Sequence, residues 1–178
     1  MDYYYIKNFL NKERISEINE ICNTGFKEPE DMGASGKHSL NKIIYWSQLR
    51  PVMEDVEHVL LNVNSKYFGY NLHQINLYKT INYNIYSGND NHRYDWHVDT
   101  ATSEDKYDLK LTALVNLSDS PYVGGDFELN TGEITHIKEF SEPGDIILFK
   151  SYILHRVKPV TSGVRKSLAF FLEGPKFI

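Results

Sequence analysis

The hydrophobic pattern changes its period at residue 73, and this change constrains the fold more than any other feature of the sequence. Before it, Ile15, Ile18 and Ile21 recur every three residues, as they do on one face of a helix. After it, apolar and polar residues alternate over residues 75–86, which predicts a long strand with two different faces. Helical segments followed by many strands indicate a mainly β protein with helices packed on one sheet.

The remaining elements follow from the same periodicities and from turn residues. Before residue 73 we expect strands at 2–6 and 43–46 and helices at 12–22 and 51–63, the second with Pro51 in its first turn. Further strands are expected at 94–98, 109–117, 125–129, 145–149, 153–157 and 164–172. Residues 27–42 are polar and rich in glycine, which predicts a loop. The sequence therefore predicts a double-stranded β-helix, or jelly roll, with N-terminal flanking helices.

Composition excludes several classes of protein. The chain has 178 residues, of which 41% are hydrophobic, and this suits one globular domain over residues 1–178. The net charge of -5 and the lack of a long basic run argue against nucleic acid as a partner. Cys22 is the only cysteine, so an intrachain disulfide or a thiolate metal cluster is excluded. Without a signal-like start or a membrane-length apolar run, we expect a soluble, cytoplasmic protein with no membrane partner.

The most informative segment ends in His97-Val98-Asp99. Side chains two residues apart on a strand point to the same side, so this imidazole and this carboxylate can meet one ion. A second imidazole from a distant strand would complete the set, and His155, which follows an apolar strand, is the best candidate. Two histidines and one carboxylate with open positions suit non-haem iron(II). An isolated His-x-Asp usually means nothing, so the prediction depends on its context.

Arg165-Lys166-Ser167 supplies part of that context. On a strand, Arg165 and Ser167 share one face, which Ala169 and Phe171 continue. A buried arginine is costly unless it meets an anion, and an arginine beside a hydroxyl can hold a carboxylate. The plain alternative is an exposed arginine on a terminal strand.

Together these residues resemble the iron(II)/2-oxoglutarate oxygenase superfamily, and within it the prolyl 4-hydroxylase-like branch. The pattern consists of His97-x-Asp99, then His155, then Arg165-x-Ser167 ten residues later. Three other segments are similar to that branch, namely Tyr86-Ser87-Gly88, the glycine-rich strand at 124–129 and the turn Pro143-Gly144-Asp145. The resemblance covers residues 74–174, which would form the catalytic β-helix, with residues 1–73 as a support region of helices and strands.

The resemblance also implies roles for single residues. His97, Asp99 and His155 would hold iron(II), and they are the predicted catalytic residues. Arg165 would bind the distal carboxylate of 2-oxoglutarate with help from Ser167.

Two further cosubstrate contacts are implied on neighbouring strands. Tyr86 would hydrogen-bond 2-oxoglutarate. Many relatives carry a tyrosine where this chain has Asn116, whose amide can donate one hydrogen bond in its place.

The activity implied is hydroxylation of an unactivated C–H bond. Iron(II), 2-oxoglutarate and dioxygen are the implied cofactor and cosubstrates, with ascorbate as a reductant, and succinate and carbon dioxide are the coproducts. A halogenating relative would have a small residue at position 99, so Asp99 predicts hydroxylation. Two alternatives remain open at this stage. A zinc hydrolase on the same three ligands would not need Arg165, and a non-catalytic cupin-like binding module would form no succinate.

The substrate is not encoded in any motif. The branch includes peptidyl-proline hydroxylases, so a prolyl peptide is our first candidate and a small molecule the other. Residues 27–42 and 100–108 are expected to form the entrance, where His92 and Arg93 are candidates for substrate contact. Trp96 alternates away from His97 and is expected to pack in the core.

Overall fold

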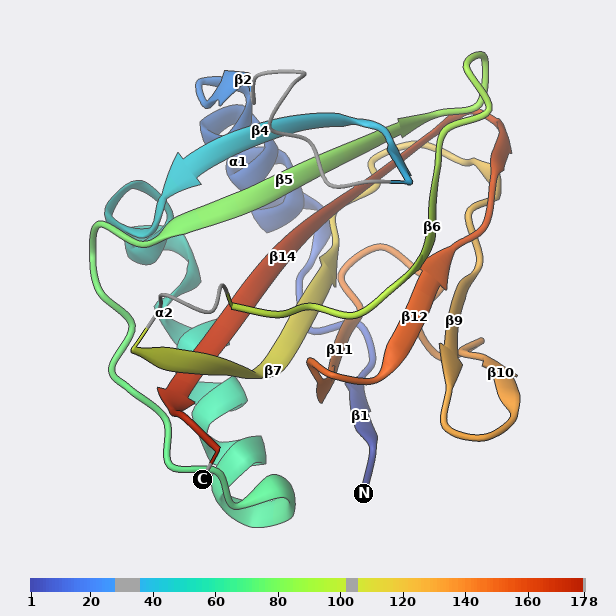
Figure 1. Cartoon of the computed structure of the whole chain (residues 1–178). Helices are drawn as coiled ribbons and strands as arrows, with labels where there is room; N and C mark the ends of the chain where they lie inside the picture. Colours follow the sequence, from blue (N-terminus) through green and yellow to red (C-terminus); the bar gives the residue numbers. More distant parts are fainter. Residues whose placement is uncertain (28–35, 102–105, 178) are drawn as a thin grey trace.

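Two antiparallel sheets dominate the computed structural model of the chain, which describes residues 1–27, 36–101 and 106–177 (Figure 1). Within these residues the larger sheet has seven strands in the order β1-β11-β7-β14-β5-β4-β2. Its strands are Tyr3–Ile6 (β1), Phe26–Lys27 (β2), Leu40–Tyr45 (β4), Thr80–Ser87 (β5), Tyr107–Asn116 (β7), Ile146–Lys150 (β11) and Val164–Pro175 (β14). The long strands β7 and β14 pair over most of their length, so the centre of this sheet is continuous.

The smaller sheet has the order β10-β9-β12-β6-β3. Its strands are Lys37–His38 (β3), Arg93–His97 (β6), Phe127–Asn130 (β9), Ile134–His136 (β10) and Leu154–Val157 (β12). A two-stranded ribbon is formed by Val123–Gly124 (β8) and Val160–Ser162 (β13). Because β6, β12 and β9 neighbour one another in this sheet, they can bring side chains from distant parts of the sequence together.

Two helices cover the far face of the larger sheet, away from β6 and β12 (Figure 1). They are Lys12–Asn23 (α1) and Trp46–Val63 (α2), and a π-helical turn, Asn64–Phe68, extends α2. The Asn11 side chain accepts a hydrogen bond from the Arg14 N–H and so caps α1. Mainly β architecture with flanking helices is thereby confirmed.

Strand alternation divides the interior into two hydrophobic clusters. Leu168 and Phe170 of β14 pack toward the helices, together with Trp46. Ala169, between them, and Phe127 of β9 pack in the space between the two sheets. The predicted assignment of residues in β14 to opposite faces is therefore correct, and one face of the larger sheet is left for a site.

The strand predicted from residue 75 is wrong in its first five positions, because β5 begins at Thr80. Asn76 accepts a hydrogen bond from the Tyr78 N–H through its side chain and one from the Lys79 N–H through its carbonyl. Such local bonds compete with a β ladder and make a turn. The apolar alternation therefore extends past the end of the strand.

The loop and the second helix predicted before residue 73 also differ from the structure. Residues 27–42 are not a continuous loop, since β3 and the first residues of β4 lie within them, while 28–35 fall outside the described residues. The second helix begins at Trp46, where the Gln48 side chain accepts from the Tyr45 N–H, and Pro51 lies inside it. Trp46 thus starts a helix where a strand end was expected.

The first seventy-three residues supply strands to the larger sheet, since β1 pairs with β11 and β4 pairs with β5. The division into a support region of residues 1–73 and a β-helix of residues 74–174 stays a prediction. Among the described residues, every helix is too short or too polar to span a membrane.

Candidate metal centre and adjoining cavity

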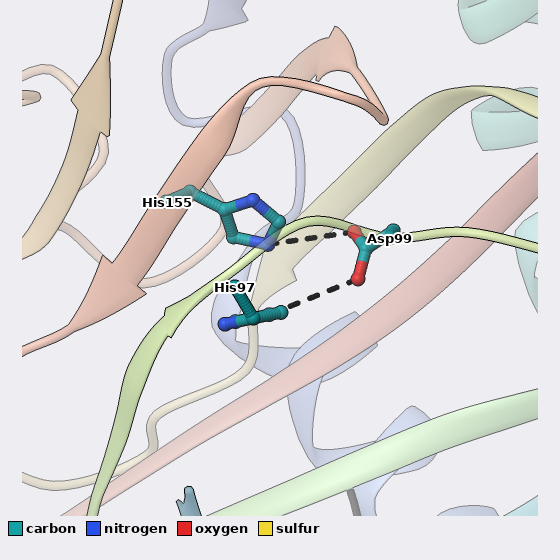
Figure 2. A group of neighbouring side chains, drawn as sticks. All are labelled: His97, Asp99 and His155. Carbon is teal, nitrogen blue, oxygen red and sulfur yellow. Dashed lines mark ion pairs between the residues drawn. The ribbon is translucent and has the colours of Figure 1, made fainter. Parts of the chain in front are cut away.

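Three side chains converge between the sheets, as Figure 2 shows. His97 ends β6, Asp99 follows two residues later, and His155 lies on β12, where it is the direct cross-strand partner of His97. One ligand atom from each lies within 4.8 Å of the others. Nε2 of His97 is 3.7 Å from Oδ1 of Asp99, and Nε2 of His155 is 3.4 Å from Oδ2. The structure therefore brings together all three residues that the sequence selected.

The second nitrogen of each imidazole is bound to backbone. Nδ1 of His97 is 2.8 Å from the Asp95 carbonyl oxygen, and Nδ1 of His155 is 2.8 Å from that of Ile153. A carbonyl can only accept, so Nδ1 carries the proton in both rings. Both Nε2 atoms then offer lone pairs toward Asp99, which is the arrangement of metal-bound histidines.

Burial sets the protonation states. It lowers the pKa of His97 to about 4, with a further contribution from His155, and it lowers the pKa of His155 to about 4. Both rings are therefore neutral near pH 7, as metal ligands must be. Burial also raises the pKa of Asp99 above its ordinary value. A cation between the three groups would offset this cost of burying the carboxylate.

Aromatic rings hold the two imidazoles. The Tyr94 ring is stacked on His97, with centroids 3.5 Å apart. Phe149 contacts His155 edge-on at 4.7 Å, and Phe127 lies 5.8 Å from the same ring. These contacts restrict ring rotation and keep water away from the inner side of the centre.

A cavity of about 230 Å³ begins at the three residues and extends between the sheets. Most of its lining comes from the inner face of the larger sheet, including Asn84, Tyr86, Thr112, Leu114, Ser167 and Phe171. A second cavity of about 700 Å³ lies outside it. The two cavities share Asn82, Tyr94, Asp99 and Phe171 as lining residues. A small molecule in the inner cavity and a larger one in the outer cavity can thus approach the same centre.

Arg165 lies beside Ser167 and Tyr86 and is only 1% exposed. Its Nη1 donates to Oγ of Ser167 over 3.3 Å, while Nη2 has no hydrogen-bond partner within the described residues. The guanidinium carbon lies 5.3 Å from the Tyr86 ring centroid. A buried cation with a free donor is costly, so this end of the site fits an anion that completes its hydrogen bonds.

Gly125 makes room for Arg165. Its φ of +68° is a left-handed conformation, and a Cβ there would lie 2.8 Å from Cδ of Arg165. A side chain at position 125 would therefore collide with Arg165, which explains why this position of the glycine-rich segment is a glycine.

Tyr86 is the cross-strand partner of Arg165 and is 2% exposed. Burial raises the pKa of its phenol to about 12. The phenol therefore keeps its proton at neutral pH and can donate it to an acceptor in the cavity.

Asn116, like Arg165, is not among the residues lining the inner cavity, but unlike Arg165 it has its side-chain hydrogen bonds made. Its Nδ2 donates to the Ser141 carbonyl over 3.2 Å and lies 3.4 Å from Oη of Tyr122. Its Oδ1 accepts from the Ser118 N–H. These bonds hold the loop after β7, and they leave the predicted contact of Asn116 with 2-oxoglutarate without structural support.

Sequence reasoning missed several polar residues of the inner cavity, among them Asn84 and Thr112. Oδ1 of Asn84 is buried without a hydrogen-bond partner in the described part of the chain. Both could have been found by alternation, since Asn84 lies two residues before Tyr86 and Thr112 four before Asn116.

The structure also places Trp96 and His92, for which the sequence predicted roles near the site. Trp96 does point away from the centre, but it is only half-buried, and the Arg156 guanidinium lies 4.6 Å from its ring. The expectation that it packs in the core is therefore wrong. His92 accepts a hydrogen bond from the Ser87 N–H through Nδ1, so it stabilises the turn between β5 and β6.

Curated relatives align with about half of the chain. A PKHD-type hydroxylase of Synechococcus sp. (strain CC9605) is 42% identical over 82 residues, which cover 45% of this chain and 36% of that protein. A PKHD-type hydroxylase of Rhizorhabdus wittichii (strain RW1) is 34% identical over 98 residues, or 51% of this chain and 41% of the relative. The chain thus aligns with less than half the length of these relatives.

Solved structures share the whole fold. A prolyl-4-hydroxylase of Pseudomonas putida superposes with a TM-score of 0.73 at 16% identity, covering 98% of this chain and 94% of that one. The viral collagen prolyl hydroxylase of Paramecium bursaria Chlorella virus-1, in its 2OG complex, has a TM-score of 0.73 at 18% identity and covers 98% and 97%. At such low sequence identities, these superpositions show that the fold is shared.

A sequence profile described as the 2OG-Fe(II) oxygenase superfamily matches residues 81–173. This range contains the three converging residues and Arg165, the same set on which the predicted resemblance depends. The match extends over more than half of the chain. The protein therefore belongs to the 2OG-Fe(II) oxygenase superfamily.

Proposed function

We propose that this protein is an iron(II)- and 2-oxoglutarate-dependent dioxygenase that hydroxylates an unactivated C–H bond. One observation carries the proposal: the His-Asp-His centre shares a cavity with Tyr86 and Ser167, the neighbours of a buried arginine whose Nη2 has no hydrogen-bond partner within the described residues. The family membership supports the same activity.

The donor set fits iron(II). His97, Asp99 and His155 would hold the ion through two neutral nitrogens and one carboxylate, which leaves coordination positions open for other molecules. Bound iron would supply the activation of dioxygen for oxidising 2-oxoglutarate to succinate and for hydroxylating the substrate. The protein's own part is to fix the ligands and to keep the centre dry, for which Phe127 and Phe149 provide apolar cover.

2-Oxoglutarate matches the two ends of the site. It is a dicarboxylate whose keto-acid end suits a metal, while its distal carboxylate suits the free Nη2 of Arg165. Ser167 would orient the guanidinium, to which it is already bonded, and Tyr86 would donate its O–H to the cosubstrate. Asn84 would add its amide from the neighbouring position on β5.

Asp99 favours hydroxylation over halogenation. Its carboxylate lies among the ligand atoms and would occupy the position that a halide needs. We expect no chlorinated product from the wild-type protein even in high chloride, by mass spectrometry of the reaction mixture. Asp99→Ala should lose most activity, and full activity in that variant would contradict the three-residue centre.

The substrate would enter through the outer cavity, which reaches Asp99. The names of the relatives and of the solved structures support a prolyl peptide as the first substrate class to test, with small molecules as the other. The outer cavity is wider than the inner one and carries both amides and aromatic rings, such as Asn76, Asn82 and Tyr107, which suit a polar chain with apolar side groups.

The deciding experiment is succinate release from 2-oxoglutarate with iron(II), dioxygen and ascorbate, measured against a panel of prolyl peptides and metabolites. Zinc in place of iron, and omission of ascorbate, are the controls. Substrate-stimulated succinate formation with iron supports a hydroxylase. Hydrolysis with zinc and no need for 2-oxoglutarate would indicate a zinc hydrolase. Binding of ligands without succinate under any condition would indicate a cupin-like binding module.

A further inference from the structure

Asp99 differs from the two histidines in how the fold holds it. His97 and His155 lie within paired strands, whereas Asp99 lies beyond the end of β6. Its backbone N–H donates to the Ser151 carbonyl over 2.9 Å, which fixes the main chain but not the carboxylate. Some other contact must orient the side chain.

Thr112 makes that contact. Its hydroxyl oxygen lies 2.7 Å from Oδ2 of Asp99 and 3.0 Å from Oγ of Ser151. A carboxylate only accepts, so the Thr112 O–H donates to Asp99, and the Thr112 oxygen is left to accept from the Ser151 O–H. The result is a directed chain of hydrogen bonds from Ser151 through Thr112 to Asp99.

This series of hydrogen bonds is anchored in the paired strands of the larger sheet. Thr112 lies in the middle of β7, with Phe149 of β11 on one side and Phe171 of β14 on the other as cross-strand partners. Thr112 is 1% exposed and Ser151 is fully buried. Hydroxyls buried this deeply need partners, and here each is the other's partner, with Asp99 as the final acceptor.

We propose that Thr112, oriented by Ser151, is a positioning residue that fixes the Asp99 carboxylate for the metal. The bond engages Oδ2, so Oδ1, which faces His97, is left for coordination. The inference rests on the proposed iron centre. It adds two residues that would not contact the metal. They would determine the orientation of the Asp99 carboxylate, as outer-shell partners of metal ligands do.

The test compares manganese(II) binding by Thr112→Val and Thr112→Ser. Valine keeps the branched shape and removes the hydroxyl, while serine keeps the hydroxyl. Manganese(II) is titrated without 2-oxoglutarate, and free ion is followed by electron paramagnetic resonance. We expect Thr112→Val to weaken the manganese Kd by about 10- to 100-fold. Thr112→Ser should stay near the wild-type value, and Ser151→Ala should fall between them.

A matched control is Thr161→Val, since Thr161 is exposed on β13 and its hydroxyl donates to the Val123 carbonyl, away from the metal centre. It should leave the Kd unchanged. The resonance of bound manganese gives a second readout, because a reoriented carboxylate alters the symmetry around the ion, and a purely structural role for Thr112 would not change that signal. Melting of the metal-free proteins reports any general loss of stability.

The outcomes separate the two proposals. If the wild-type protein binds manganese and the Kd of Thr112→Val lies within about twofold of the wild-type Kd, the positioning role alone is overturned. If Thr112→Val melts early, the serine variant decides, because a Thr112→Ser protein that binds as weakly as the valine protein overturns the role. A wild-type protein that binds no manganese, or a His97→Ala variant that still binds it, would overturn the metal centre itself.

Discussion

Both faces of the larger sheet contain deeply buried residues, but the two faces differ in chemistry. On the helix side, Phe170 is 2% exposed and packs edge-on against Trp46 at 5.2 Å. The buried polar groups of Tyr83 and Trp46 on that face carry no charge: Tyr83 Oη donates to Oδ1 of Asn19, and Nε1 of Trp46 is buried without a partner within the described residues. On the inner side, Arg165 is 1% exposed and has an unused donor. Depth alone therefore does not distinguish core from site, whereas a buried charged group with an unused donor does.

This difference implies that stability and ligand binding can be changed separately, although the residues concerned alternate along the same strands. Substitutions on the helix side should reduce the free energy of unfolding and leave ligand affinities of the folded protein alone. Substitutions on the inner side should do the reverse, because a ligand, not the protein, completes those groups.

The largest effect is expected at the metal centre. His97→Ala or His155→Ala should abolish iron(II) binding and 2-oxoglutarate turnover, because two ligands cannot replace three on an open site. The fold should persist, since neither imidazole belongs to the hydrophobic cluster between the larger sheet and the helices. Metal titration and circular dichroism measure the two effects. His58→Ala, on the exposed side of α2, is the control. Near-wild-type turnover in either ligand variant would refute the assignment.

Arg165→Ala should have the next largest effect. A charge-assisted hydrogen bond is worth about 1.5–3 kcal/mol, so the apparent KM for 2-oxoglutarate should rise at least about tenfold. Metal affinity should barely change. Arg156→Ala, on the outer face beside Trp96, removes an arginine from the same protein without touching the cavity. An unchanged 2-oxoglutarate dependence in Arg165→Ala would mean that another group binds the anion.

Phe170→Ala tests the helix side. Removing a buried phenylalanine costs about 3–5 kcal/mol of unfolding free energy, measured by urea denaturation. Measured on folded protein at low temperature, the KM for 2-oxoglutarate should stay at the wild-type value, although Phe170 lies between the inner-face neighbours Ala169 and Phe171 on β14. A KM change as large as that of Arg165→Ala would show that the two faces are coupled.

The sequence predicted the long strands and the site better than the short strands. Alternation in β7 and β14 continues over many residues and fixes which side chains face the cavity. The two- and three-residue strands β2, β3, β8, β10 and β13 were not predicted, because segments this short show no period. The pairing of β3 depends on a neighbour that is distant in sequence, with Lys37 beside Tyr94.

The same reasoning explains which site residues were found. His97, Asp99, His155 and Arg165 stand out because imidazoles, a carboxylate and a guanidinium have few uses at such spacing. The partners of Thr112 and Asn116 could not be inferred, because they come from the chain after β11 and from the loop after β7. Hydroxyl and amide groups have many possible partners, and only the tertiary structure decides among them.

The smallest effect is expected at Gly125, and it tests how closely Arg165 must be held. Gly125→Ala has two consequences: strain, because φ is +68°, and a contact of 2.8 Å with Cδ of Arg165. Gly69→Ala is a matched control, since Gly69 has a φ of +73° and nothing within 4 Å of its Cβ position. Both variants should lose about 1 kcal/mol or more of stability from the backbone alone. Only Gly125→Ala should also raise the KM for 2-oxoglutarate, by a few fold, because the guanidinium shifts without being lost. Equal KM values in the two variants would mean that the position of Arg165 tolerates displacement, and that the inner face recognises its anion by charge more than by geometry.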